Sequence, residues 1–347
     1  MKIVVFGLGS IGQRHVRILQ KLKPDLEIVA VQSRKRPLII HDDLTVEEGD
    51  PADFYGIQSV AHSHGILQAG DVVFVTNPIS MHVGATANAL SKRCHVFIEK
   101  PLALNAAEAR LLQPFARSAG VVVMVGYNLR FHPAIKAIKT ILDNLTLGRL
   151  HRAKIHFGEY LPDMHSYEDY RATHMARSSE GGGVVRCLSH EVDLARYLFG
   201  EPTSICGYQG MTGILDVDVE DFLESVLLFQ PAEGVFPVNL SLNFLDRPPQ
   251  RSIEIQGDKG LVVWRYADPF LKIFDSAGGV RKLLFDSFVR NNMFWDQCSH
   301  FFDCISSGHS PESDFESAFK TTELCDRLLS LPKLSSKNSL SINPKYI

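Results

Sequence analysis

The chain lacks the features that mark secreted, membrane and nucleic-acid-binding proteins. Its six cysteines are scattered and form no C-x-x-C pair, which argues against a zinc ribbon, a thioredoxin-like site and a disulfide framework. No segment approaches about 18 consecutive apolar residues, and the first strand begins without a cationic leader. The 36 Lys and Arg residues nearly balance the 39 Asp and Glu residues. We therefore expect reduced, mostly buried thiols, a cytoplasmic location, and neither a membrane nor a nucleic-acid partner.

Length and apolar patterning predict two domains. A single core stops growing at about 250 to 300 residues, and this chain has 347. Up to residue 127, short apolar runs alternate with helical patterns, which is typical of a parallel sheet buried on both faces. The predicted strands are Ile3–Phe6, Ile28–Val31, Val72–Val75, Val96–Ile98 and Val121–Val125, and the helices include Met81–Leu90 and Ala106–Ser118. Residues 1–127 are therefore predicted to form a doubly wound α/β domain of the Rossmann type.

The pattern of apolar residues changes in residues 128–332. After a helix predicted from Pro133 to Leu145, longer strand-like segments include Phe222–Phe229 and Val235–Phe244. The sequence Gly257-Asp258-Lys259-Gly260 is a hairpin signal. We predict an α+β domain with a largely antiparallel sheet, followed by an extended tail at 333–347.

A glycine-rich turn follows the first strand. It reads Gly7-Leu8-Gly9-Ser10-Ile11-Gly12 and leads into a helical pattern. Gly7 allows a sharp turn, Gly9 lets the backbone approach a pyrophosphate, and Gly12 lets helix and strand pack closely. The helix start presents free N–H groups to phosphates. The motif predicts a dinucleotide site that includes Ser10 and Ile11, against the alternative of a plain structural turn.

The end of the second strand bears on the choice of cofactor. NAD-binding units place an acidic side chain about 20 residues after the glycines, where it binds the ribose 2′-hydroxyl. Here the strand ends in Gln32-Ser33-Arg34-Lys35-Arg36, which contains no carboxylate. Ser33 and Arg34 can bind a 2′-phosphate, which favours NADP. The alternative is a solvated basic loop and NAD held through backbone contacts.

Two further strands end in candidate site residues, because open α/β sheets bind ligands beyond the carboxyl ends of their strands. Lys100 lies there in Glu99-Lys100-Pro101, and a cis X-Pro bond would fix the direction of its ammonium. The alternative is an ordinary surface cation. Thr76-Asn77-Pro78 follows the preceding strand, with His82 one turn into the next helix. We expect these residues to line the ribose and nicotinamide of the cofactor.

His190 is the candidate general base of the second domain. Ser189 suits an N-cap and Gly200 a helix stop, so His190 falls in a first turn, where the helix dipole favours a neutral imidazole. Asp193 shares its face and can orient it. The alternative is a capping or packing role. Leu194 occupies the fifth position of a would-be H-E-x-x-H motif, so we expect no metal.

A short stretch of aromatic, acidic and cationic residues precedes His190. Rings stack on sugar faces, while carboxylates and a guanidinium bind hydroxyls or a charged group. The candidate substrate residues there are Tyr160, Asp169, Tyr170 and Arg171. The alternative is an ordinary solvated loop.

Together these motifs resemble the Gfo/Idh/MocA family of sugar and polyol oxidoreductases. The resemblance is clear over residues 1–199 and rests on G-L-G-S-I-G-Q-R-H, T-N-P with His82, E-K-P, G-Y-N-L-R-F and G-G-G followed by H-E-V-D. It implies that Lys100 hydrogen-bonds the reacting hydroxyl and that His190 is a general acid/base. It also implies that Asn128 and Arg130 lie near the nicotinamide and substrate, with Glu99 beside them. The second domain would be an open sheet that often forms a homo-oligomer interface, in a dimer or tetramer.

One departure from the family pattern concerns the surroundings of His190. Many members carry an aspartate one helical turn before the histidine, whereas Val185-Arg186-Cys187-Leu188 contains no carboxylate. Either Asp193 or a residue of another loop orients His190, or Lys100 dominates proton transfer. The combination of S-I-G-x-R-H with L-P-D-M-H and E-D-Y-R resembles a branch associated with bacterial cell-surface sugar biosynthesis. That likeness implies amino sugars, nucleotide-linked sugars or nonulosonic-acid-type sugars as substrates.

The predicted function is an NADP-preferring or NAD-using dehydrogenase. It would transfer a hydride between the nicotinamide and a secondary hydroxyl or keto group of a sugar. A non-catalytic NAD(P)-binding sensor of the same fold is the alternative from another class. A tightly held cofactor that shuttles hydride within one cycle is a third possibility.

Overall fold

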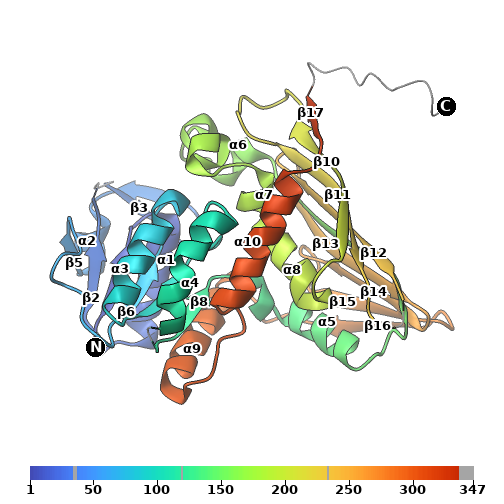
Figure 1. Cartoon of the computed structure of the whole chain (residues 1–347), viewed down its shortest axis with the longest axis horizontal. Helices are drawn as coiled ribbons and strands as arrows, with labels where there is room; N and C mark the ends of the chain where they lie inside the picture. Colours follow the sequence, from blue (N-terminus) through green and yellow to red (C-terminus); the bar gives the residue numbers. More distant parts are fainter. Residues whose placement is uncertain (34–36, 119, 233, 336–347) are drawn as a thin grey trace.

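The computed structural model describes residues 1–33, 37–118, 120–232 and 234–335 (Figure 1). A parallel sheet of six strands lies in the first half of the chain. Its order in space is β5 (Gln58–Val60), β2 (Ile28–Val31), β1 (Ile3–Phe6), β6 (Val72–Val75), β7 (His95–Ile98) and β8 (Val123–Val125). The predicted doubly wound domain is confirmed, with the last strand starting at Val123 rather than Val121.

Helices cover both faces of this parallel sheet. They are α1 (Ser10–Leu22), α2 (Pro51–Tyr55), α3 (His82–Ser91) and α4 (Ala106–Ser118), and a small hairpin of β3 (Leu38–Ile40) and β4 (Val46–Glu48) lies beside them. Every residue of β6 is buried, since a central strand has helices on both sides. The rings of Phe74 and Phe97 stack with centroids 4.9 Å apart on one face.

A second, larger sheet of nine strands occupies the other half of the molecule (Figure 1). Its order is β16 (Val280–Leu284), β15 (Phe270–Asp275), β14 (Gly260–Arg265), β13 (Gln250–Gly257), β9 (Leu150–Gly158), β12 (Phe236–Asn243), β11 (Phe222–Phe229), β10 (Ser204–Met211) and β17 (Lys333–Ser335). The pairs β9–β12 and β10–β17 run parallel, and the other pairs are antiparallel. The prediction of a largely antiparallel sheet is confirmed.

One face of the large sheet packs on helices, and no helix of the described residues covers the other, bare face (Figure 1). The covering helices are α5 (Pro133–Asp143), α7 (Val184–Cys187), α8 (Ser189–Phe199) and α10 (Phe315–Leu329). Burial alternates along β12, as expected for a strand with one covered face. The predicted tail is wrong at its start, because β17 pairs with β10; residues 336–347 lie outside the described residues.

Helix α9 (Arg290–Ser307) packs against the parallel sheet rather than the large one. The ring of Phe301 lies 5.9 Å from that of Phe74 and 5.7 Å from that of Phe97. Apolar residues of both halves therefore form one continuous core. The division into 1–127, 128–332 and 333–347 stays a prediction, with α9 as the element that crosses it.

Candidate active site

The glycine turn lies between β1 and α1 and has the geometry of a phosphate cradle. Gly7 has a φ of +96°, and a Cβ added at Gly12 would lie 2.1 Å from the carbonyl oxygen of Gly7. A Cβ added at Gly9 would meet no described heavy atom within 4 Å. No described side chain caps the first turn of α1. Free N–H groups therefore face open space, which fits a dinucleotide pyrophosphate.

The residues that follow β6 are fixed by hydrogen bonds. The hydroxyl of Thr76 lies 2.8 Å from the carbonyl oxygen of Gly7, so it fixes the turn. The imidazole of His82 lies 2.9 Å from the Pro101 carbonyl oxygen and 3.0 Å from that of Asn77. His82 is 2% exposed, and burial lowers its pKa. It ties the segments after β6 and β7 together, and its place beside the cofactor stays a prediction.

Asn77 is the residue at this edge with a polar group left over. Its buried side-chain oxygen has no hydrogen-bond partner among the described residues. An orphaned acceptor beside the glycine turn fits a ribose hydroxyl or an amide of the cofactor. Pro78 follows it and caps the short 3-10 helix Ile79–Met81.

Lys100 connects the two halves of the molecule. It follows β7 directly, and its bond to Pro101 is cis, as predicted. Its ammonium donates a hydrogen bond of 2.7 Å to the carbonyl oxygen of Cys187, at the end of α7. Cys187 lies directly before Leu188, Ser189 and His190, so the lysine reaches the segment that carries the candidate base.

Glu99 points away from the open edge and into the core. Its Oε1 lies 2.6 Å from Nε2 of His15 on α1, and Nδ1 of His15 lies 3.5 Å from the sulfur of Cys298 on α9. Its Oε2 accepts from the backbone N–H of Lys100 at 3.3 Å. This chain of contacts fixes the base of Lys100, and the sequence analysis did not identify His15 as part of it.

His190 lies in the first turn of α8, but the predicted cap is wrong. α7 runs almost directly into α8, so Ser189 is already helical, and no described side chain caps this start. The stop at Gly200, with a φ of +87°, is confirmed. Burial, followed by the positive charges of Lys100, Arg251 and Arg290, holds the pKa of His190 well below its ordinary value. The imidazole is therefore neutral.

Asp193 does not orient His190. Its carboxylate binds Arg130 through two contacts of 2.6 and 2.8 Å and accepts from Thr321 at 3.1 Å. Asp193 is 1% exposed and Arg130 is 3% exposed. Arg130 also donates to Ser317 at 2.9 Å and to the Glu312 carbonyl oxygen. Asp193 is expected to orient His190 or bind substrate and Arg130 to lie near the substrate, whereas the structure has them as a buried ion pair that holds α8 to α10.

The candidate base also lacks a partner elsewhere. Nδ1 of His190 is buried and has no hydrogen-bond partner among the described residues. Arg186, one turn earlier, donates instead to the Leu104 carbonyl oxygen at 2.7 Å. The edge of the His190 ring faces Tyr127, with centroids 5.9 Å apart. Of the options weighed from sequence, the contacts of Asp193 contradict the one in which it orients His190, and the dominance of Lys100 in proton transfer stays a prediction.

Comparison with known proteins supplies the family. Residues 1–127 match the model of an oxidoreductase family with an NAD-binding Rossmann fold, GFO_IDH_MocA. Residues 135–263 match the model of the GFO/IDH/MocA C-terminal domain. The chain belongs to the Gfo/Idh/MocA family.

Individual relatives are distant. Scyllo-inositol 2-dehydrogenase (NAD(+)) of Bacillus subtilis is 27% identical over 211 residues, which cover 60% of this chain and 57% of that protein. The levoglucosan dehydrogenase complex with NADH has a TM-score of 0.80 at 18% identity, covering 95% of this chain and 96% of that one. UDP-N-acetylglucosamine 3-dehydrogenase from Acidithiobacillus ferrooxidans has a TM-score of 0.74 at 18% identity, covering 94% and 96%. The chain spans 53 to 57% of the length of the curated relatives it matches first.

Within this Gfo/Idh/MocA fold, the aromatic and charged stretch lies on the loop after β9. Tyr160 precedes the short helix α6 (Leu161–Met164), under the guanidinium of Arg247. Asp169 and Arg171 are exposed and pair with each other at 2.9 Å. The phenol oxygen of Tyr170 accepts from the backbone N–H of Asp216 at 3.1 Å. Their role as substrate contacts stays a prediction.

The same loop does come near the lysine. Burial, with the charge of Lys100 as the next cause, lowers the pKa of His174 to about 4. Asn128, in the 3-10 helix Asn128–Phe131, is buried after β8. Ser33 is exposed after β2. Arg34 lies outside the described residues, so its contact with a 2′-phosphate stays a prediction.

The structure adds two arginines that the sequence analysis missed. Nε of Arg251, on β13, lies 2.7 Å from Oε1 of the fully buried Glu191, next to His190. Its guanidinium stacks on Phe157, 3.7 Å from the ring centroid. Arg290, the first residue of α9, is exposed. Neither lies in a recognisable motif, so pattern alone could not have found them.

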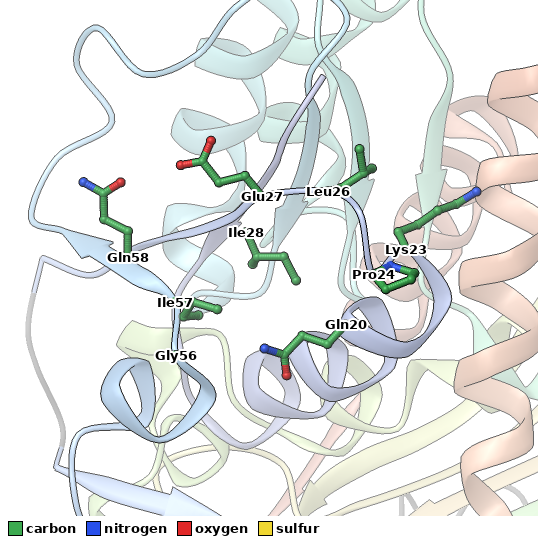
Figure 2. A pocket seen from close by; sticks show the side chains of 9 residues that line it. All are labelled: Gln20, Lys23, Pro24, Leu26, Glu27, Ile28, Gly56, Ile57 and Gln58. Atoms are coloured by element: carbon green, nitrogen blue, oxygen red, sulfur yellow. The ribbon is translucent and has the colours of Figure 1, made fainter.

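A hollow of about 380 Å³ lies far from these residues (Figure 2). It is formed by the end of α1, the end of α2 and the starts of β2 and β5, with side chains that include Gln20, Lys23, Glu27 and Gln58. This is the amino edge of the parallel sheet, opposite Lys100. Across the described ranges, no helix is long and apolar enough to cross a membrane. The same ranges hold no cluster of three His, Cys, Asp or Glu residues suited to a metal ion.

Proposed function

We propose that this protein is an NAD(P)-dependent dehydrogenase that transfers a hydride between the nicotinamide and a secondary hydroxyl or keto carbon of a sugar or polyol. The observation that carries the proposal is the position of Lys100. Its ammonium lies beyond the carboxyl end of β7 and bonds to the carbonyl that leads into the His190 helix. The family match and the free N–H groups at Gly9 support a dinucleotide beside it.

The chain's own residues would have the following roles. The start of α1, with Thr76 and Asn77, holds the cofactor, which supplies or accepts the hydride. In the reducing direction, the Lys100 ammonium donates its proton to the substrate oxygen as the carbon receives the hydride. In the oxidising direction, the Lys100 amine accepts the hydroxyl proton. His190, kept neutral by burial, hydrogen-bonds the same oxygen and fixes its direction.

For the cofactor, we propose a preference for NADP over NAD. Ser33 follows the second strand at the place where NAD-binding units carry a carboxylate, and no residue from Gln32 to Arg36 has a carboxylate that would repel a 2′-phosphate. The test compares fluorescence titrations of NADPH and NADH, with Arg34→Ala as the variant. If Arg34→Ala loses affinity for NADPH but not for NADH, the preference is supported. Equal losses of affinity for both cofactors contradict it.

For the substrate, we propose a polyhydroxylated ring. Relatives are named for an inositol, for levoglucosan and for a UDP-linked amino sugar. Nucleotide-linked and nonulosonic-acid-type sugars remain the finer proposal from the resemblance. We further propose a homo-oligomer through the bare face of the large sheet, which size-exclusion chromatography with light scattering would test.

The deciding experiment combines binding and turnover. NADH and NADPH are titrated by fluorescence. Turnover of a panel of sugars, inositols and UDP-sugars is followed by the absorbance of the reduced nicotinamide at about 340 nm. Lys100→Met should lower kcat by about 10²- to 10⁴-fold and leave cofactor affinity within a few-fold. His190→Asn should lower kcat by about tenfold, since the role of His190 is to position the substrate oxygen.

Two outcomes separate the alternatives. Saturable cofactor binding with no turnover on any substrate would favour the non-catalytic sensor, to which the missing carboxylate before His190 also points. Absence of saturable binding to any pyridine nucleotide would remove the proposed function altogether.

A further inference from the structure

We propose that Arg290 binds an anionic group of the substrate, a carboxylate or a phosphate, and thereby selects acidic sugars over neutral ones. The inference rests on the proposed dehydrogenase function and names the substrate class of that same site. It depends on where α9 lies, on how its first turn is held, and on which cations nearby lack a negative partner.

The face of α9 that carries Arg290 points at the active-site lysine. Residues 290, 294 and 298 are spaced by four and share one side of the helix. The sulfur of Cys298 lies 3.5 Å from His15, and the Phe294 ring lies 6.4 Å from the His15 ring. His15 in turn binds Glu99, the neighbour of Lys100. Arg290 is one turn further along, past the edge of the parallel sheet where Lys100 lies.

The first turn of α9 is held firmly beside the glycine turn. The side-chain amide of Asn291 donates to Asp42 at 2.7 Å, and its oxygen accepts from Arg14 on α1. The guanidinium of Arg14 lies 5.0 Å from the Phe294 ring centroid. The backbone of Arg290 is therefore fixed at the end of α9 that lies beside α1.

The charge of Arg290 acts on groups of both halves of the molecule, which agrees with the position of the first turn of α9. The positive charge of Arg290 acts on Arg14, near the glycine turn. It also acts on Glu159, at the end of β9, and on His190. The two latter residues belong to the large-sheet half. Arg290 therefore lies close enough for its charge to act on groups of both halves near Lys100.

The three cations of this region differ in their partners. Arg251 is paired with the buried Glu191 at 2.7 Å. Lys100, by contrast, is bonded to a neutral carbonyl. Arg290 makes no ion pair or hydrogen bond with any residue that the structure describes, and it lies at a helix start, where the dipole disfavours a positive charge. An arginine without an ion-pair partner, held on α9 near the edge where Lys100 lies, is suited to a planar anion.

The test measures ligand binding to the native protein loaded with NADH. D-glucuronate, glucose 6-phosphate and D-glucose are titrated by calorimetry, which separates a carboxylate, a phosphate and their neutral parent. The native protein should bind at least one anion about 10- to 100-fold more tightly than glucose, and this ratio should fall as salt rises. Arg290→Gln should abolish this preference for the anion over glucose, and Arg290→Lys should keep part of it. Arg281→Gln, an exposed arginine on β16, is the matched control and should leave it unchanged.

The outcomes are separable from those of the proposed function. Failure of NADH itself to bind counts against the dehydrogenase assignment, whatever Arg290 does. With NADH bound, equal affinity for glucose and both anions, or no anion binding at all, overturns the proposal. A loss of NADH affinity in Arg290→Gln would assign the arginine to the cofactor pyrophosphate and also overturn it.

Discussion

The two edges of the parallel sheet differ in a way that shows what marks a site. The amino edge has the hollow of about 380 Å³, lined by mixed surface side chains (Figure 2). The carboxyl edge instead has polar groups without a partner among the described residues: the N–H groups at the start of α1 and the buried side-chain oxygen of Asn77. Unsatisfied polar groups cost free energy, so their gathering at one edge indicates a ligand more strongly than volume does.

The largest effect is expected at the glycine turn. Gly12→Val should lower the free energy of unfolding by about 3 to 5 kcal/mol and abolish NADH binding, because its side chain would collide with the Gly7 carbonyl. Urea unfolding and fluorescence titration measure the two effects. Gly9→Ala is the control: it should unfold like the native protein yet bind NADH more weakly. Normal NADH affinity in Gly12→Val would contradict the cradle at the carboxyl edge.

A buried arginine sharpens the contrast with Arg290. Arg130→Met should lower the free energy of unfolding by about 3 kcal/mol, because it leaves the Asp193 carboxylate buried without its partner. The double variant Arg130→Met with Asp193→Leu should recover most of that loss. Arg290→Gln should leave stability within about 0.5 kcal/mol. Urea unfolding of the native protein and the three variants measures these differences. A free energy of unfolding of Arg130→Met close to the native value would show that the ion pair contributes little.

A smaller, pH-dependent effect is expected at His132, just beyond the carboxyl edge. Its Nδ1 accepts from the Ala134 N–H and caps α5, so the imidazole must be neutral, and burial with the charge of Arg251 lowers its pKa to about 4. The unfolded chain binds the proton near pH 6.5, so stability is full above that pH and falls as pH drops toward 4. The slope is about 1.4 kcal/mol per pH unit.

The matched variant for this prediction is His132→Asn, which keeps a capping oxygen but does not titrate. Chemical unfolding between pH 7 and 4.5 should give a shallower decline for the variant than for the native protein. Identical slopes would mean that His132 is not the group responsible.

The smallest effect is expected at the amino edge. Gln58→Leu and Gln20→Ala alter the wall of the hollow but should leave NADH affinity and turnover within about twofold of the native values. Their stability should change by less than about 0.5 kcal/mol. A tenfold loss of NADH affinity in either variant would break the comparison, because it would make the hollow part of the site.

Local signals predicted the first half of the fold well and the second half in outline. The apolar runs of β1, β2, β6 and β7 were recognisable because parallel strands are buried on both faces. The short β5 carries the sequence QSV, which gives no such signal, and it was missed. The N-cap at Ser189 failed because a second helix runs into α8, which depends on how the Gly181–Gly183 segment packs.

The sequence by itself determined the turn, the strand ends and the lysine, because each depends on backbone geometry that neighbouring residues encode. Tertiary structure alone decided the partners of the charged groups. Asp193 has the spacing to serve His190 but binds Arg130, 63 residues away in the chain. Arg290, 100 residues after His190 in the chain, comes near it because α9 packs back onto the parallel sheet. Charge pairing acts through space, so spacing along the chain cannot specify it.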